Sequence, residues 1–184
     1  RGKFGSEQFS MDKERMKETS DTLVRAVEYF AATRTGALIV IERETALSDI
    51  AETGIIMNSA LSESLIENLF YKGSPLHDGA VILRDDRIYA AGCVLPLSEN
   101  NNLSKDLGTR HRAGVGITEV SDAVVLIVSE ETGIISMAVD GRLSRFLDLK
   151  TVDKMLLNHY MSRLDRKRPG RDWIGQLFRG GRNG

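Results

Sequence analysis

The sequence contains little cysteine, little proline and no long apolar run, and each shortage narrows what the protein can be. The single cysteine, Cys93, excludes a disulfide within the chain and fits a reducing compartment, where we expect it to be a small core residue. Only 3 prolines and 41% hydrophobic residues argue against wholesale disorder. No apolar stretch approaches the roughly 20 residues that a helix needs to cross a bilayer. We therefore expect the 184 residues to form one soluble domain with a sizeable core.

Charge and chain ends add two expectations. The formal net charge is −1, which does not indicate a nucleic-acid-binding protein, although basic residues dominate after Arg163. No signal peptide is recognisable, and the chain begins at Arg1 rather than at Met. This start indicates a piece of a longer protein, so the lack of a membrane segment says little about the intact molecule.

The apolar periodicity predicts helices around a cluster of mostly adjacent strands. Helices are predicted over residues 8–32, 59–73 (capped by Asn58 or Ser59) and 149–164, with a short one from Thr109; strands are predicted over residues 36–42, 55–57, 80–83, 88–95, 122–129 and 133–140. Neighbouring strands are joined by short turns at Arg84–Arg87 and Glu130–Thr132, and Asp140-Gly141 is a further hairpin signal, so part of the sheet must be antiparallel. We predict an α/β fold with a mixed, partly antiparallel sheet and helices on both faces.

A histidine, an aspartate and a glycine stand directly before a predicted buried strand, at His77, Asp78 and Gly79. Asp-Gly is a common turn dipeptide, so a plain turn is one interpretation. A strand end is also a rigid place from which to aim a carboxylate at a substrate. These residues alone leave both interpretations open.

The stretch GTRHR breaks a rule of helix composition. With Thr109 as the N-cap, Arg110, His111 and Arg112 occupy the first turn, where each cation opposes the helix dipole by about 0.3–1 kcal/mol. A bound phosphate would reverse the sign of this interaction, since it would meet free backbone N–H groups and guanidinium forks. A solvated basic turn is the alternative.

Other patterns are weaker. Ser129, Glu130 and Glu131 follow a predicted strand, where polar groups can converge on a ligand or form an ordinary acidic turn. The chain has no phosphate-binding GxxxxGK[ST] loop, no CxxC pair and no HExxH. Gly114 and Gly116 form a lone GxG within a helix, which favours close packing over dinucleotide binding.

Taken in order, PLHDGAVIL, LGTRHRAGVGITEVSD and VSEETG resemble the diadenylate cyclase (DAC) family, most closely its membrane-anchored, CdaA-type members. The likeness rests on the DGA motif from Asp78 to Ala80 and the RHR motif from Arg110 to Arg112, and it extends over about residues 27–160. It implies a single DAC-type domain over residues 23–165, preceded by a helical extension over 1–22 and followed by a basic tail over 166–184.

The resemblance implies condensation of two ATP into cyclic di-AMP with release of two pyrophosphates, in a homodimer with face-to-face sites. The expected catalytic residues are Asp78, Gly79, Arg110, His111 and Arg112. His77 and Asp78 are the expected ligands of a divalent metal, Mn²⁺, Mg²⁺ or Co²⁺. The expected ATP-binding residues are Asp78, Gly79, Ala80, Leu95, Gly108, Thr109, Arg110, His111, Arg112, Ser129, Glu130 and Glu131.

It further implies transmembrane helices ahead of this domain in a full-length protein at the cell membrane, with the catalytic domain cytoplasmic. A membrane-associated regulator and phosphoglucosamine mutase are implied as partners, and nucleic acid is not. Two alternatives stay open: a non-catalytic sensor that binds an adenine nucleotide, and an interaction domain whose basic tail contacts lipid or protein.

Overall fold

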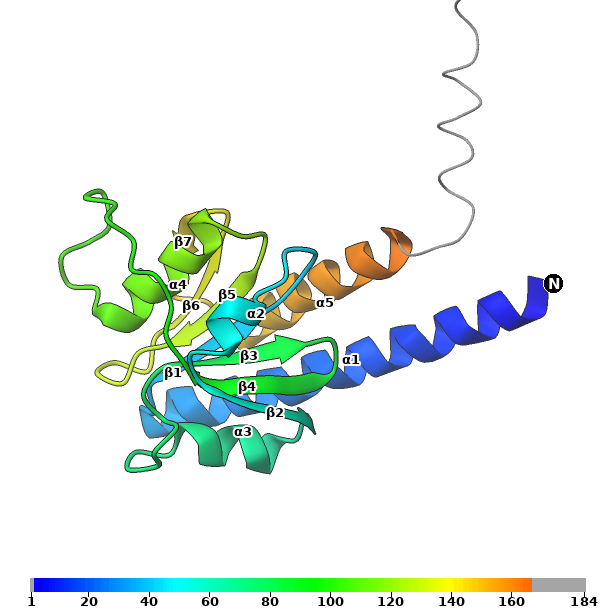
Figure 1. Ribbon diagram of the computed structural model, residues 1–184, viewed down its shortest axis with the longest axis horizontal. Coiled ribbons are helices and arrows are strands. Elements are labelled where there is room, and N and C mark those ends of the chain that lie inside the picture. Colours follow the sequence, from blue (N-terminus) through cyan, green and yellow to red (C-terminus); the bar gives the residue numbers. More distant parts are fainter. Residues whose placement is uncertain (1, 167–184) are drawn as a thin grey trace, which may run out of the picture.

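Seven strands form one mixed sheet in the order β2-β4-β3-β1-β5-β6-β7 (Figure 1). This computed structural model describes residues 2–166. The strands are β1 (Ala37–Ile41), β2 (Ile55–Ala60), β3 (Ala80–Arg84), β4 (Arg87–Cys93), β5 (Val124–Val128), β6 (Ile135–Val139) and β7 (Arg142–Ser144). β1 and β3 run parallel, and every other neighbouring pair is antiparallel. The predicted mixed, partly antiparallel sheet is confirmed.

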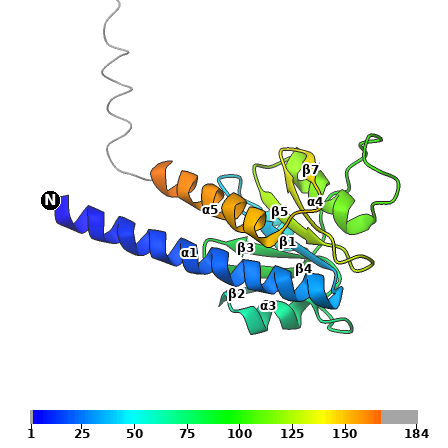
Figure 2. The same cartoon turned by 180° about the vertical axis from the view of Figure 1, so that it is seen from behind.

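Helices cover both faces of this sheet, as predicted (Figures 1 and 2). Helices α1 (Gly2–Thr33), α3 (Glu63–Phe70) and α5 (Leu149–Arg166) cover one face; α2 (Ser48–Ala51) and α4 (Thr109–Glu119) lie on the other. Ile39 and Ile41 of β1 face α1, whereas Leu38 and Val40 pack in the cluster that contains α4. Burial on both faces explains the unbroken apolar run of this strand.

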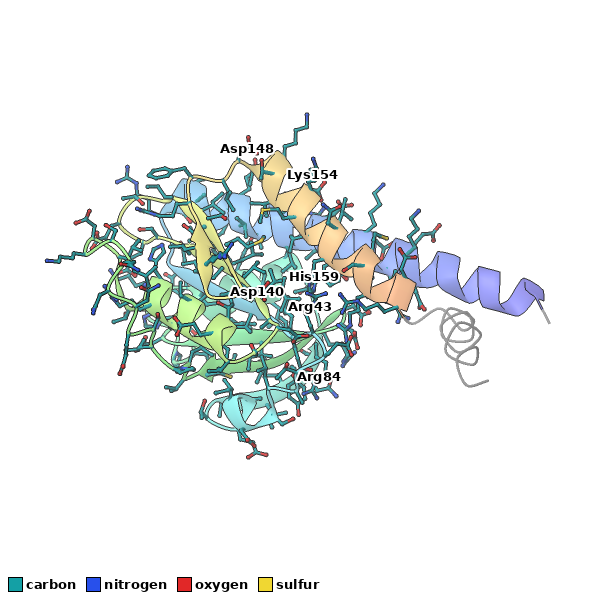
Figure 3. All side chains as sticks on the ribbon, turned by 90° about the horizontal axis from the view of Figure 1, so that it is seen from above. Arg43, Arg84, Asp140, Asp148, Lys154 and His159 are labelled. Atoms are coloured by element: carbon teal, nitrogen blue, oxygen red, sulfur yellow. The ribbon has the colours of Figure 1, made fainter. Side chains whose placement is uncertain are left out.

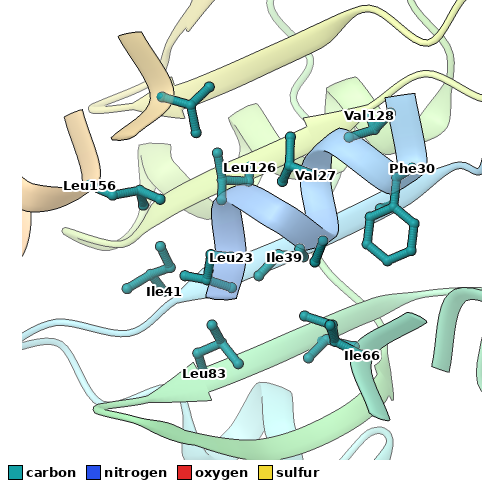
Figure 4. Close-up of a cluster of buried hydrophobic side chains, with 14 of the residues drawn as sticks. Leu23, Val27, Phe30, Ile39, Ile41, Ile66, Leu83, Leu126, Val128 and Leu156 are labelled. Carbon is teal, nitrogen blue, oxygen red and sulfur yellow. The ribbon is translucent and has the colours of Figure 1, made fainter. Parts of the chain in front are cut away.

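The larger core forms between α1 and the sheet (Figure 4). Leu23, Val27 and Phe30 recur at helical spacing on one face of α1 and are fully buried. The ring of Phe30 meets that of Phe70 from α3 edge to face, with centroids 5.4 Å apart. These contacts fix the end of α1, and therefore the segment that enters β1.

Helices α1 and α5 lie side by side and extend past the sheet together (Figure 2). Both are tied to the turn between β3 and β4, through Arg15–Asp86 at 3.4 Å and Arg163–Asp85 at 3.1 Å. His159 of α5 lies in the core beside Arg43 (Figure 3), and burial, followed by the two nearby arginines, lowers its pKa to about 4.

No break in α1 marks the domain boundary predicted at residues 22 and 23, which stays a prediction. Beyond Arg166, the predicted basic tail lies outside the described residues. Within residues 2–166, no helix combines the length and the apolar character that a bilayer crossing requires.

Local differences from the sequence prediction concern element ends. Strand β2 covers residues 55–60 and is longer than the predicted strand over 55–57. Helix α3 therefore begins later than predicted, and its N-cap is Ser62, whose Oγ accepts a hydrogen bond from the N–H of Leu65. The Asp140-Gly141 turn leads into a short last strand, β7, which was not predicted. Gly108, not Thr109, is the N-cap of α4.

The two glycines of α4 permit close packing, as predicted, and they differ in a testable way. A Cβ at Gly116 would lie 2.0 Å from the carbonyl oxygen of Pro96, whereas one at Gly114 would lie 2.6 Å from Cδ1 of Ile127, a buried side chain. We expect Gly116→Ala to lower the free energy of unfolding by about 1–3 kcal/mol in urea denaturation, since a backbone must move. Gly114→Ala is the comparison and should lose less stability, because only the side chains of Ile127 and Val125 must adjust there. Equal stabilities would contradict the steric argument.

Candidate functional site

Three strand ends meet at one edge of the sheet. Because β1 is parallel to β3 and antiparallel to β5, the start of β1, the start of β3 and the end of β5 lie together. Ala37 pairs with Val128, and Ile39 pairs with Val81, one residue into β3. The segments that hold Asp78 and Ser129 therefore open at the same edge, although they are far apart in the sequence.

The turn before β3 has a tightly determined conformation. Gly79 has φ +112°, and a Cβ there would lie 2.8 Å from the carbonyl oxygen of Cys93, so both backbone and space require glycine. His77 is anchored through its Nδ1, 2.6 Å from the carbonyl oxygen of Ser74. Since a carbonyl oxygen can only accept a hydrogen bond, Nδ1 donates, and Nε2 is the ring nitrogen left for another partner. The exposed Asp78 is thus presented from a rigid turn.

Helix α4 begins without a negative charge to balance the positive end of its dipole. Its N-cap, Gly108, provides no side-chain hydrogen bond, and its first turn contains no acidic residue. The backbone N–H groups of this turn and the cations at Arg110 and Arg112 therefore form a positive helix terminus. This confirms the rule-breaking composition that the sequence indicated.

Arg110 makes two contacts that hold it in place. Its Nη1 lies 2.9 Å from Oε2 of Glu130, which follows β5. Its guanidinium also rests against Gly36, where a Cβ would come within 2.5 Å of Cζ and Nη1. The ion pair brings the start of α4 to the edge where the three strand ends meet.

His111 is buried at the same helix start. It is 6% exposed, and its Nε2 has no hydrogen-bond partner among the described residues. Burial, and then the charges of Arg145 and Arg110, lowers the pKa of its imidazole. His111 is therefore neutral at pH 7 and can offer a hydrogen bond but not a positive charge.

Three cavities surround Arg110, which lines all of them. The Asp78 cavity, of about 210 Å³, is lined by residues that include Asp78, Gly79, Leu95, Leu97 and Thr109. The Ser129 cavity, of about 440 Å³, is lined by residues that include Gly108, Thr109, His111, Ser129 and Arg145. The Lys72 cavity, of about 260 Å³, is lined by residues that include Gly36, Lys72, His77, Glu130 and Glu131.

The structure thus brings together most, but not all, of the residues predicted from the sequence. The carboxylate of Asp78 and the RHR helix start share one cavity, and Glu130 and Glu131 also line the Ser129 cavity. His77 lines a different cavity from Asp78. Ala80 is fully buried in β3, and Arg112 lines none of the three cavities.

Several lining residues carried no signal in the sequence. Lys72 and Arg145 contribute positive charge, and Gly36 contributes space, from segments without a motif. Cys93, predicted as a core residue, is buried, and burial raises the pKa of its thiol to about 11. A thiol that remains protonated is a packing group and not a nucleophile.

Comparison with known proteins gives consistent results. Residues 24–143 match the protein family described as "DisA bacterial checkpoint controller nucleotide-binding" (DAC). The chain is 47% identical over 156 residues to "Cyclic di-AMP synthase CdaA" of Bacillus subtilis, an alignment that covers 85% of this chain and 57% of that protein. The chain therefore spans little more than half the length of this relative.

Two solved structures are also similar. A double mutant of DacA from Staphylococcus aureus superposes with a TM-score of 0.77 at 49% identity, covering 78% of this chain and 95% of that one. A "hypothetical membrane spanning protein" from Bacillus cereus has a TM-score of 0.69 at 43% identity, covering 71% of this chain and 64% of that one. The family match over residues 24–143 includes every lining residue of the three cavities except Arg145.

Proposed function

Because the chain belongs to the DisA bacterial checkpoint controller nucleotide-binding family, the diadenylate cyclase (DAC) family, we propose that it condenses two ATP into cyclic di-AMP and two pyrophosphates. One observation carries the proposal: a carboxylate, Asp78, and a positive helix terminus at Thr109 and Arg110 line the same cavity. A carboxylate beside a phosphate-binding terminus is unnecessary for gripping a nucleotide but suits activation of a hydroxyl group.

The cavities suggest how ATP binds. The Asp78 cavity combines apolar walls from Leu95 and Leu97 with a carboxylate, which suits a nucleoside. The adjoining Ser129 cavity offers the N–H groups at the start of α4, the hydroxyls of Thr109 and Ser129, and Arg145, which suit a triphosphate. Arg110 lines both cavities and would contact the phosphate nearest the ribose.

A divalent metal would find two donors on adjacent residues, His77 and Asp78, which line two cavities that share Arg110. No group of three or more His, Cys, Asp or Glu side chains within residues 2–166 is arranged to hold a metal ion. His77, through its Nε2, and Asp78 would supply two ligands, and substrate phosphates would supply others, as is common for nucleotide-bound metals. When bound, the metal lowers the pKa of the attacking hydroxyl and neutralises phosphate charge. The imidazole ligand favours Mn²⁺ or Co²⁺ over Mg²⁺.

The residues of the chain then have separate tasks. Asp78 accepts a hydrogen bond from the ribose 3′-hydroxyl and orients its oxygen toward an α-phosphorus. As the new O–P bond forms, the bond to pyrophosphate breaks, and the hydroxyl proton passes to Asp78 or to water. Arg110 and the N–H groups of α4 stabilise the charge that develops on the phosphate, and neutral His111 donates a hydrogen bond without adding charge.

Each ATP must both attack and be attacked, and a single site that holds one ATP cannot satisfy both demands. Two copies of the domain facing each other about a two-fold axis solve this, since the hydroxyl of each nucleotide then faces the phosphate of the other. We therefore propose a homodimer as the productive form. In a full-length protein we place the domain on the cytoplasmic side of the membrane, with a membrane-associated regulator and phosphoglucosamine mutase as its partners. The name of the Bacillus cereus protein supports the membrane location.

The direct test incubates the purified protein with ATP and, separately, Mn²⁺, Mg²⁺ or Co²⁺, and identifies products by mass spectrometry. We expect cyclic di-AMP with two pyrophosphates per product, and no cyclic product from GTP. If no cyclic dinucleotide forms at any protein concentration or with any of the three metals, the proposed cyclase activity is refuted. Tight ATP binding without turnover would instead support a nucleotide sensor.

A further inference from the structure

Gly36 makes an unusually close approach to the guanidinium of Arg110. A Cβ on Gly36 would lie 2.5 Å from Cζ, 2.5 Å from Nη1 and 3.0 Å from Nε of Arg110. Any residue other than glycine would therefore occupy the place of the guanidinium. Gly36 precedes β1 and follows α1, so it is held between two elements that are packed in the core.

The backbone itself does not require glycine at this position. Among the described residues, the glycines with φ in the left-handed region are Gly73, Gly79, Gly92, Gly133 and Gly141, and Gly36 is not among them. Its nearest non-neighbouring atoms all belong to the Arg110 side chain. Accommodating that side chain is thus the visible reason for glycine at position 36.

Glu130 contacts the same side chain through its ion pair, with Oε2 2.9 Å from Nη1. The guanidinium is 24% exposed and forms part of the wall of all three cavities. A side chain held by two contacts is pre-organised, so it loses little freedom when a phosphate binds. Its position, and not only its charge, is determined by residues outside the RHR motif.

We propose that Gly36 is a positioning residue: it provides the space that keeps the Arg110 guanidinium at the junction of the three cavities, where it meets the reacting phosphate. This inference rests on the proposed cyclase function. Displacement of a catalytic group by about 1 Å can cost roughly 10²-fold in rate. The contact with Gly36 is close enough for a single methyl group to cause such a displacement.

Gly36→Ala tests the proposal without removing any charge. The added methyl group meets the far end of a flexible side chain, so Arg110 should move while the fold is preserved. We expect kcat to fall roughly 10²-fold, KM for ATP to change far less, and the thermal unfolding midpoint to remain unchanged.

A double-mutant cycle separates positioning of Arg110 from other effects of Gly36. Lysine has no planar fork to collide with the methyl group, so Gly36→Ala should cause no further loss in the Arg110→Lys background. Equal losses in both backgrounds would overturn the proposal, as would an unchanged kcat in Gly36→Ala. The Nε–Hε NMR signal of Arg110, assigned by its absence in Arg110→Lys, should shift in Gly36→Ala. That signal does not depend on turnover, so an absent shift refutes the positioning role even if the protein is not a cyclase.

Discussion

Replacing Asp78 with asparagine is expected to reduce cyclic di-AMP formation by about 10³-fold or more while leaving the fold and ATP binding intact. A positioned acid–base group contributes roughly 10²–10⁴-fold, and Asp78 would also lose its charge toward the metal. Within the described part of the chain, its exposed carboxylate makes no hydrogen bond or ion pair. The substitution therefore removes no structural contact, and the effect should fall on chemistry alone.

Three measurements define this result: product formation by mass spectrometry, ATP affinity by calorimetry and the thermal unfolding midpoint. Asp140→Asn is a matched control, because Asp140 is also exposed, also stands at a strand end and lines none of the three cavities. Its φ of 50° is one that asparagine tolerates. An Asp78→Asn protein with near wild-type turnover would remove Asp78 from the mechanism.

Specific activity is expected to fall steeply when the protein is diluted. If two weakly associated copies must face each other, the rate of product formation follows the square of protein concentration below the dissociation constant. A tenfold dilution then lowers the rate by about a hundredfold and the specific activity by about tenfold. Initial rates over a dilution series, compared with sedimentation velocity at the same concentrations, test this directly.

Adding the inactive Asp78→Asn protein sharpens the experiment. It should capture wild-type subunits in mixed pairs, in which only one of the two bonds can form, so cyclic product falls as the variant is added in excess. An equal amount of an unrelated protein is the control for crowding. A rate strictly proportional to concentration, from a protein that sediments as a monomer, would contradict the face-to-face arrangement.

Sequence reasoning was most successful where burial is complete. β1 and β5 are apolar at every position because both of their faces are covered, and such runs are distinctive. The two edge strands were less predictable. Burial alternates only weakly along β2, and β7 has only three residues, so pairing with the neighbouring strand, not local sequence preference, defines them. The start of α3 was misplaced for the same reason, since β2 occupies the residues expected to cap it.

The residues of the candidate site also fall into a predictable and an unpredictable group. Asp78 and Arg110 were predicted because motifs mark them, and the structure brings them to one cavity. Lys72, Arg145 and Gly36 could not be predicted, because strand pairing and helix packing, not local sequence, bring them to the site. A glycine that accommodates an arginine 74 positions later leaves no periodic trace in the sequence.

The meeting of three strand ends at one sheet edge also has a consequence for folding. The contacts that assemble the site, Ala37 with Val128 and Ile39 with Val81, link distant parts of the chain and form slowly relative to local helices. No intermediate in which β1 has yet to pair with both β3 and β5 can contain the complete site. Recovery of activity during refolding is therefore expected to lag behind recovery of helical circular dichroism, so that the first turnover marks completion of the central sheet.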